Sequence, residues 1–336
     1  MTETSKKEIY TYEAPFVAYA MAWNRRPTSH KLRMAVSSYK EEYSNQIHII
    51  QRDEVTSSSQ PGNSLVKIAE FEHPYPATKL MWAPPSINSS HDLMATTGDY
   101  LRLWGIDDEN GSVLSTNVLN NNKHTEYCAP LTSFDWNETD PTMIGTCSID
   151  TTCTIWDVNR MTPKTQLMAH DKEVYDIAFA SGKDVFGTVG ADGSLRMFDL
   201  RSLEHSTILY ESPDLSPLLR ISWNKEEPNY IATIMTDSPK AIILDIRVPS
   251  LPLAELVGHE AAVNSVTWAP NSAFHVCTCS DDKQAFIWDI TVKPKPIEDP
   301  ILAFSAGGSI NSLEWCPSHV DWVSICYDNF VQILKV

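Results

Sequence analysis

GHEAAVNSVTWAPNSAFHVCTCSDDKQAFIWDI, residues Gly258–Ile290, is the stretch that decides the fold. It begins with a Gly-His pair and closes on a Trp-Asp pair. Side chains along Val263–Trp268 alternate between two faces, as they do in a β-strand. Phe274–Ser280 is rich in residues that suit a pleated sheet, Asp281–Lys283 has the composition of a turn, and Phe286–Trp288 is a third short apolar segment. The stretch therefore predicts three consecutive antiparallel strands.

A unit with these ends is the signature of one blade of a WD-repeat β-propeller, which has a period of about 40–45 residues. Each blade is a sheet of four antiparallel strands. First strands that end on an aromatic residue recur along the chain at Trp23, Trp82, Trp136, Phe179, Trp223, Trp268 and Trp315. The last four spacings fit one blade each, whereas the first two are longer and require insertions. The polar runs 56–64 and 86–92 are the candidate insertions.

The chain supplies seven third strands but only six fourth strands. We expect third strands at 47–50, 101–104, 154–156, 195–198, 241–244, 285–288 and 331–334. We expect fourth strands at 65–71, 113–119, 165–168, 207–210, 252–256 and 301–304. Since an open ring would expose sheet edges, we expect residues 7–14 (KEIYTYEA) to pair with the third strand of blade seven. The prediction is an all-β, seven-bladed WD-repeat β-propeller, with residues 1–336 forming one domain closed by its N-terminal strand.

Polar side chains recur at matching positions in several blades. In repeats of this kind the loop His bonds the turn Asp, and the Trp N–H is expected to bond the Ser, so that no buried polar group is unpaired. A catalytic set would appear once, in a cleft, so this recurrence argues for a structural role and against an enzyme. The residues concerned are His259, Ser280, Asp282 and Trp288 in blade six, Ser148, Asp150 and Trp156 in blade three, and His170 and Asp192 in blade four.

His275, Cys277 and Cys279 lie on one face of a predicted strand and could suggest zinc. Side chains two residues apart splay along a strand, however, and no fourth ligand is near in sequence. Core packing of small buried cysteines is favoured instead. The sequence contains no nucleotide-binding or metalloprotease motif, so we expect no metal and no cofactor.

The formal net charge is −17, which argues against direct nucleic-acid binding and favours basic partner segments. The seven cysteines show no disulfide-like spacing and are expected to be reduced. We find no apolar run of signal-peptide or membrane-span type, and expect neither.

Two segments, Phe198–Arg201 and Leu244–Arg247, carry Asp-x-Arg directly after a third strand. They resemble the Trp-Asp-x-Arg box of propellers that dock on the cullin-four adaptor, with Phe and Leu in place of Trp. In that resemblance Arg201 and Arg247 reach out from one face of the ring. The alternative is that each Arg pairs with a local carboxylate.

The chain as a whole resembles the WD-repeat regulators typified by plant Transparent Testa Glabra and Anthocyanin-eleven, whose animal member is DDB-and-cullin-associated factor seven. The match includes loop residues that a propeller alone does not dictate. The matching segments are 8–15, 71–82, 128–141, 148–157, 170–179, 190–210, 223–233 and 297–302. The polar runs 56–64 and 86–92 show no resemblance.

The resemblance implies a non-enzymatic scaffold in nucleus and cytoplasm. We expect the propeller to be a monomer. Its implied partners are MYB or basic-helix-loop-helix regulators and dual-specificity tyrosine-regulated kinases. The alternative is a substrate receptor of a cullin-four ubiquitin ligase, in which the cullin-four adaptor is the partner. Independently of the resemblance, candidate contact residues lie where the first strands begin, at Tyr75, Tyr127, Tyr175, Asn264 and Asn311. Arg201 and Arg247 are the candidates for contact with the adaptor.

Overall fold

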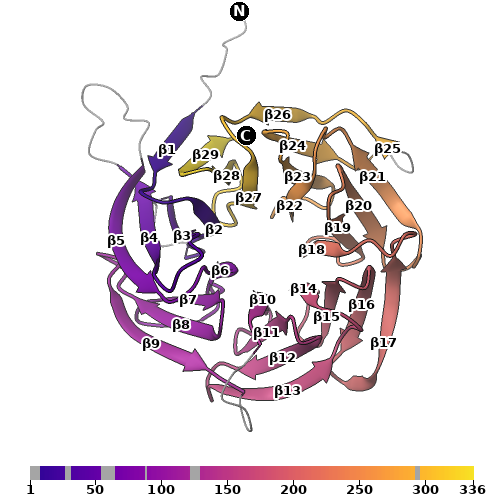
Figure 1. The fold of residues 1–336 in the computed structure, drawn as a ribbon, viewed down its shortest axis with the longest axis horizontal. Coiled ribbons are helices and arrows are strands. Elements are labelled where there is room, and N and C mark those ends of the chain that lie inside the picture. The colour runs from indigo at the N-terminus through magenta and orange to yellow at the C-terminus, as the bar shows by residue number, and fades with distance from the viewer. Residues whose placement is uncertain (1–7, 27–31, 54–64, 88, 122–128, 292–295) are drawn as a thin grey trace, which may run out of the picture.

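The chain forms seven β-sheets arranged as a ring (Figure 1). The computed structural model describes residues 8–26, 32–53, 65–87, 89–121, 129–291 and 296–336. All regular elements in these ranges are strands, and none of the ranges contains a helix that could cross a membrane. The predicted all-β, seven-bladed propeller is confirmed.

Each blade is a sheet whose first strand lies nearest the ring axis. The first strands are β2 (Ala18–Trp23), β6 (Lys79–Trp82), β10 (Leu131–Trp136), β14 (Val174–Phe179), β18 (Leu218–Trp223), β22 (Val263–Trp268) and β27 (Ile310–Trp315). The second strands are β3 (Arg33–Ser38), β7 (Asp92–Thr97), β11 (Met143–Ser148), β15 (Val185–Gly190), β19 (Tyr230–Met235), β23 (His275–Ser280) and β28 (Trp322–Tyr327).

The outer half of each blade follows the same order. The third strands are β4 (Asn45–Arg52), β8 (Leu101–Ile106), β12 (Thr152–Asp157), β16 (Ser194–Asp199), β20 (Lys240–Asp245), β24 (Gln284–Asp289) and β29 (Phe330–Lys335). The fourth strands are β5 (Leu65–His73), β9 (Val113–Leu119), β13 (Thr162–Met168), β17 (Ser202–Glu211), β21 (Pro252–Val257), β26 (Leu302–Ser305) and, in blade seven, β1 (Ile9–Glu13).

The aromatic residues that end the first strands pack between neighbouring blades. Trp268 belongs to a cluster that includes Tyr230 and Ile234 of blade five. Its indole N–H donates to the Ser222 carbonyl oxygen of that blade at 2.9 Å, and Trp82 likewise donates to Ala22 of blade one at 3.1 Å. A buried indole needs such a partner, so in these blades the aromatic residue both fills the core and bonds the adjacent sheet, whereas Trp136, Trp223 and Trp315 donate to a carbonyl oxygen of their own blade.

The ring is closed by the N-terminal strand. β1 pairs antiparallel with β29, from Ile9 opposite Leu334 to Glu13 opposite Phe330. Tyr10 is buried in a cluster with Trp23 of blade one and Trp322 of blade seven. The predicted closure is confirmed. Residue 7 of the predicted strand lies outside the described residues.

One strand has no counterpart in the sequence prediction. β25 (Pro296–Ile297), in the connector between β24 and β26, pairs in parallel with β21 and gives blade five a fifth strand. Pairing of so short a segment with a strand of another repeat leaves no local periodicity to detect.

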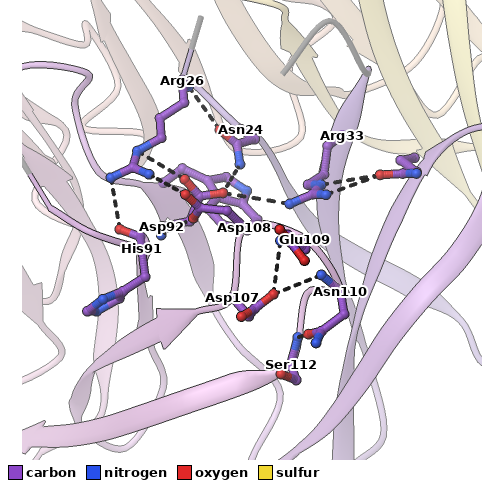
Figure 2. A network of polar contacts seen from close by, with 12 residues as sticks. Asn24, Arg26, Arg33, His91, Asp92, Asp107, Asp108, Glu109, Asn110 and Ser112 are labelled. Carbon is purple, nitrogen blue, oxygen red and sulfur yellow. Dashed lines mark hydrogen bonds and ion pairs between the residues drawn. The ribbon is translucent and has the colours of Figure 1, made fainter. Parts of the chain in front are cut away.

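Residues 91 and 92 of the predicted insertion at 86–92 are fixed against blade one by a polar network (Figure 2), and residue 88 lies outside the described residues. Asp92 is buried and its carboxylate accepts from the Asn24 side chain at 2.6 Å and pairs with Arg26 at 3.1 Å. Arg26 also reaches Asp108 at 2.8 Å and the His91 carbonyl oxygen at 2.9 Å. The insertion therefore joins blade two to the loop that follows β2. The other candidate insertion, 56–64, lies outside the described residues.

Deleting residues 1–14 should lower the melting temperature by about 5–15 °C, because it exposes the edge of β29 and the pocket that Tyr10 fills. Differential scanning fluorimetry on the full chain and the deletion measures this. Removal of residues 1–7 alone is the control and should leave the melt nearly unchanged. Equal melting temperatures for the full chain and the longer deletion would contradict the role given to β1.

Candidate partner-binding surface

The ring presents two different faces. The first and third strands of a sheet run in the same direction, because each is antiparallel to the second. The turns between second and third strands therefore share a face with the segments that lead into the first strands. We call this the histidine face, since His259 and His170 lie there. The turns after the third strands lie on the opposite face, which we call the arginine face, since Arg201 and Arg247 lie there.

In blade six the recurring polar residues form a continuous chain on the histidine face. His259 Nδ1 lies 2.8 Å from Asp282, and its Nε2 lies 2.8 Å from the Thr278 hydroxyl. Trp288 Nε1 donates to that hydroxyl at 2.8 Å. A carboxylate can only accept, so His259 donates to Asp282 and accepts from Thr278. Burial lowers the pKa of His259, although Asp282 opposes this shift.

The prediction that the Trp288 N–H bonds Ser280 is wrong. The Ser280 hydroxyl donates to the Ala261 carbonyl oxygen at 3.0 Å and accepts from the Asp282 N–H at 3.2 Å. Ser280 therefore fixes the turn, and the Thr278 hydroxyl is at the centre of the hydrogen-bonded series that links Asp282, His259 and Trp288. Because Thr278 and Ser280 both follow the alternation of β23, the sequence pattern did not distinguish them.

Blades two, three and four each have a threonine at the position that corresponds to Thr278. In blade three Trp156 Nε1 donates to Thr146 at 2.8 Å, while Ser148 donates to the Pro130 carbonyl oxygen and Asp150 accepts from Thr152. In blade four His170 lies 2.9 Å from Asp192 and 2.8 Å from Thr188, with Phe198 in place of the Trp. In blade two Trp104 and His73 both contact Thr96 at 3.0 Å. This blade differs in the turn, because Asp99 pairs with Arg102. His73 Nδ1 contacts the Tyr75 carbonyl oxygen.

These side chains are arranged to hold turns and do not converge on a reaction centre. Their buried nitrogens and hydroxyls are satisfied by one another or by backbone carbonyl oxygens, so none of these side chains is an activated nucleophile facing solvent. His275 contacts the Ser272 hydroxyl at 2.7 Å, and Cys277 and Cys279 are buried against blade seven. Burial raises the pKa of the Cys277 thiol to about 12, and the described residues contain no cluster of three metal-ligand side chains.

The first strands enclose a cavity of about 450 Å³ on the ring axis, with charged groups on its wall. Asp176 on β14 is the centre of this wall. Its carboxylate accepts from the Ile221 N–H of blade five at 3.0 Å and from the Ser133 hydroxyl of blade three, and it pairs with Lys79 of blade two at 3.4 Å. Burial disfavours the charged form of Lys79, but Asp176 and Asp135 outweigh it and raise the pKa of Lys79. One carboxylate thus ties four blades together.

Two further acidic side chains on the cavity wall each accept a hydrogen bond from a backbone N–H of the next blade. Asp135 accepts from the Phe179 N–H at 2.7 Å, and Glu314 accepts from the Trp23 N–H at 3.2 Å. Burial raises the pKa of Glu314 to about 7, although Arg25 opposes the shift. Since Glu314 belongs to blade seven and Trp23 to blade one, its bond lies at the closure of the ring.

The candidate contact residues fall on both faces and differ in availability. On the histidine face Tyr75 and Asn311 are exposed and Tyr175 is half-buried. Asn264 joins blade six to blade seven, donating to Asp281 at 2.8 Å and to the Ile310 carbonyl oxygen at 2.9 Å. Tyr127 lies outside the described residues.

Arg201 and Arg247 both lie on the arginine face, after the third strands of the neighbouring blades four and five. Arg201 Nε donates to Asp199 at 2.9 Å, and Arg247 does the same to Asp245 at 2.9 Å, each through a two-point pair. The local carboxylate pairing that the sequence left open is therefore present. The arginine side chains are still 69 % and 57 % exposed, so the pairing fixes each guanidinium without covering it.

Sequence reasoning missed Tyr39 and Tyr43, which are exposed on the histidine face. The ring of Tyr43 lies against that of Tyr75. Tyr39 and Tyr43 lie in the turn that joins β3 to β4. The signal available was the length of that segment, 39–44 (YKEEYS), which lacks the Gly or Pro of a tight turn.

Replacing Thr278 with Val should lower the free energy of unfolding by about 2–4 kcal/mol, because His259 and Trp288 both lose a buried partner. The matching change at Thr188 should cost about half as much, since Phe198 needs no partner. Urea unfolding measures both, with Thr207→Val, an exposed strand position, as the control. Equal losses at positions 278 and 188 would contradict the hydrogen-bond assignment.

Glu314→Gln should stabilise the protein at pH 8 by about 1–3 kcal/mol, and the gain should shrink as the pH falls toward 4.5. The folded pKa lies above the unfolded one, so the native state binds more protons in this range and loses stability as the pH rises. The opposite sign is expected for Glu138→Gln. Burial acts to raise the pKa of Glu138, but Arg25, 2.6 Å away, and Lys225 together outweigh burial and lower that pKa. Thermal melts of both variants across this pH range provide the comparison, and a gain for Glu314→Gln that does not depend on pH would refute the assignment.

Comparison with known proteins agrees with this architecture. Residues 118–157, 161–199 and 250–289 match the WD40 family, described as "WD domain, G-beta repeat". The chain is 56 % identical to the DDB1- and CUL4-associated factor 7 homolog of Dictyostelium discoideum, over 98 % of this chain and 99 % of that protein.

Two fungal proteins are also similar. An uncharacterized WD repeat-containing protein of Schizosaccharomyces pombe is 41 % identical over 89 % of this chain and 73 % of its own length. A WD repeat-containing protein of Saccharomyces cerevisiae is 32 % identical over 85 % of this chain and 59 % of its own length. The chain belongs to the family of WD-repeat propellers that includes DDB1- and CUL4-associated factor 7.

Proposed function

We propose that this protein is a non-enzymatic, protein-binding propeller that acts as a receptor subunit of a cullin-four ubiquitin ligase. The observation that carries the proposal is the 56 % identity, over 98 % of the chain, to a protein named for its association with DDB1 and CUL4. In this function the propeller docks on the adaptor through one face and holds another protein on its other face. No chemistry is required of its own side chains.

The arginine face supplies the features expected of an adaptor contact. Arg201 and Arg247 each place an exposed guanidinium beside an Asp two residues earlier. The bond to Arg201 holds the pKa of Asp199 well below its usual range, so the pair stays ionised at neutral pH. An arginine fixed in this way loses little side-chain entropy when a partner binds its remaining N–H groups.

A second candidate function is a scaffold for transcription regulators of the MYB or basic-helix-loop-helix classes, or for protein kinases. It is favoured by the exposed tyrosines of the histidine face, which lie away from the arginines that would contact the adaptor. Tyrosine is enriched among residues that dominate binding energy at interfaces. The two functions are compatible, because they use opposite faces.

Charge reversal of both arginines, R201E with R247E, should weaken binding to purified DDB1 at least about tenfold, because it replaces two ordered donors with like-charged groups next to Asp199 and Asp245. Biolayer interferometry with the full chain measures this. The matched control is Arg160→Glu in blade three, where the side chain is 82 % exposed and lies 3.8 Å from Asp157. That variant should bind DDB1 as the unaltered protein does.

The same variants separate the two functions in cells. If proximity labelling with the double variant loses DDB1 but still recovers kinases or transcription regulators, the scaffold acts independently of the ligase. Unchanged DDB1 binding by the double variant would refute the docking of the adaptor at Arg201 and Arg247.

A further inference from the structure

Blade one carries the longest of the turns between second and third strands. It has six residues, Tyr39–Ser44, whereas the corresponding turns of the other blades have two to four. Asn45 is buried beneath it. The side-chain Oδ1 of Asn45 accepts from the Ser38 hydroxyl at 2.8 Å and from the Lys40 N–H at 2.9 Å. Its side-chain Nδ2 donates to the Lys40 and Glu42 carbonyl oxygens at 3.1 and 3.0 Å. One buried side chain with four hydrogen bonds makes this turn a rigid support.

The turn displays aromatic side chains to solvent. Tyr43 is 69 % exposed, and its ring lies edge-on to Tyr75 with the centroids 5.0 Å apart. Tyr39 is also exposed, and its N–H donates to the carbonyl oxygen of exposed Val17 at 2.9 Å. The exposed tyrosines in the described part of the chain are these three, all in blade one or the connection that leaves it. We call Val17, Tyr39, Tyr43 and Tyr75 the tyrosine patch.

The charges around the tyrosine patch are mostly acidic. Glu41 and Glu42 are exposed in the same turn, where Lys40 is the one base. The exposed residue Asp328 joins the patch from blade seven, because its carbonyl oxygen accepts from the Ala18 N–H at 2.7 Å. Glu41 raises the pKa of the Tyr39 phenol, as a negative local potential should. Apolar rings with an acidic border complement a segment that is both basic and apolar.

We propose that the tyrosine patch binds an extended segment of a partner protein in which Arg or Lys is interspersed with apolar residues. Cations stack favourably on tyrosine rings, and apolar side chains fill the space between them. The protein uses this contact internally, since the Arg52 guanidinium lies 4.6 Å from the centre of the Tyr10 ring and that of Arg102 lies 5.7 Å from Tyr100. In the described residues no such cation lies over Tyr43 or Tyr75.

This inference deepens the proposed function, since it names the chemistry of the segment held on the histidine face. Its test uses a fluorescein-labelled peptide of Arg-Leu-Gly repeats and the full-length protein, with fluorescence anisotropy at an ionic strength of about 0.15 M. Y43S combined with Y75S should weaken binding at least about tenfold, because it removes the two edge-to-face rings of the tyrosine patch. E41Q with E42Q should weaken binding less and reduce its dependence on salt.

Matched peptides and variants separate this site from general attraction to an acidic protein. Glu-Leu-Gly repeats should not bind, and Arg-Ser-Gly repeats should bind more weakly than the Arg-Leu-Gly peptide. Met168→Ser with Ile208→Ser removes exposed apolar groups on outer strands and should leave binding unchanged. R201E with R247E should also leave peptide binding unchanged, and the tyrosine variant should keep its DDB1 binding, so each proposal can fail without the other.

Three outcomes would overturn the inference. These are an Arg-Leu-Gly peptide that does not bind, a Tyr43 and Tyr75 variant that binds it as tightly as the unaltered protein, and equal losses in the tyrosine variant and the Met168 and Ile208 variant. Circular dichroism and thermal melts of each variant show whether it is folded. Because Tyr43 and Tyr75 are exposed, their replacement should not change the melt.

Discussion

The pairing of β1 with β29 is the constraint on which the ring depends. Blade seven is made from the two ends of the described chain, so its five backbone pairs, Ile9 with Leu334 to Glu13 with Phe330, convert a curved row of sheets into a closed one. Without them β29 would be an open edge, and the cluster of Tyr10, Trp23 and Trp322 would lose a member. Closure joins the first blade to the last, so that every blade has a neighbouring blade on both sides.

Closure is reinforced from the inside by carboxylates. Asp176 contacts groups from three other blades, and Glu314 bonds the backbone of blade one from blade seven. A buried carboxylate is stable only when donors surround it, and here the donors belong to neighbouring sheets. The polar groups along the axis therefore fix the blades relative to one another, while the aromatic residues behind them supply the apolar contacts.

A ring fixed in this way can present two independent surfaces. The histidine face carries short turns held by buried threonine and histidine, with a single long turn in blade one. The arginine face carries arginines fixed by their own aspartates. Because both sets are held in place before any partner arrives, little ordering is needed for binding, and this suits a protein that assembles others.

The sequence alone predicted the number of blades, the strands and the closing strand, because aromatic spacing and two-residue alternation are local signals. It also predicted the contact between His259 and Asp282, which recurs with the repeat. Tertiary structure decided what depends on neighbours in space: the choice of Thr278 over Ser280, the parallel strand β25, the reach of Asp176 across four blades, and the pairing of Tyr43 with Tyr75. These contacts join residues that are far apart in the sequence, or depend on which of two hydroxyls on the same face of one strand meets a partner. Periodicity along the chain cannot distinguish Thr278 from Ser280, and it cannot show which distant carboxylate will meet a given group.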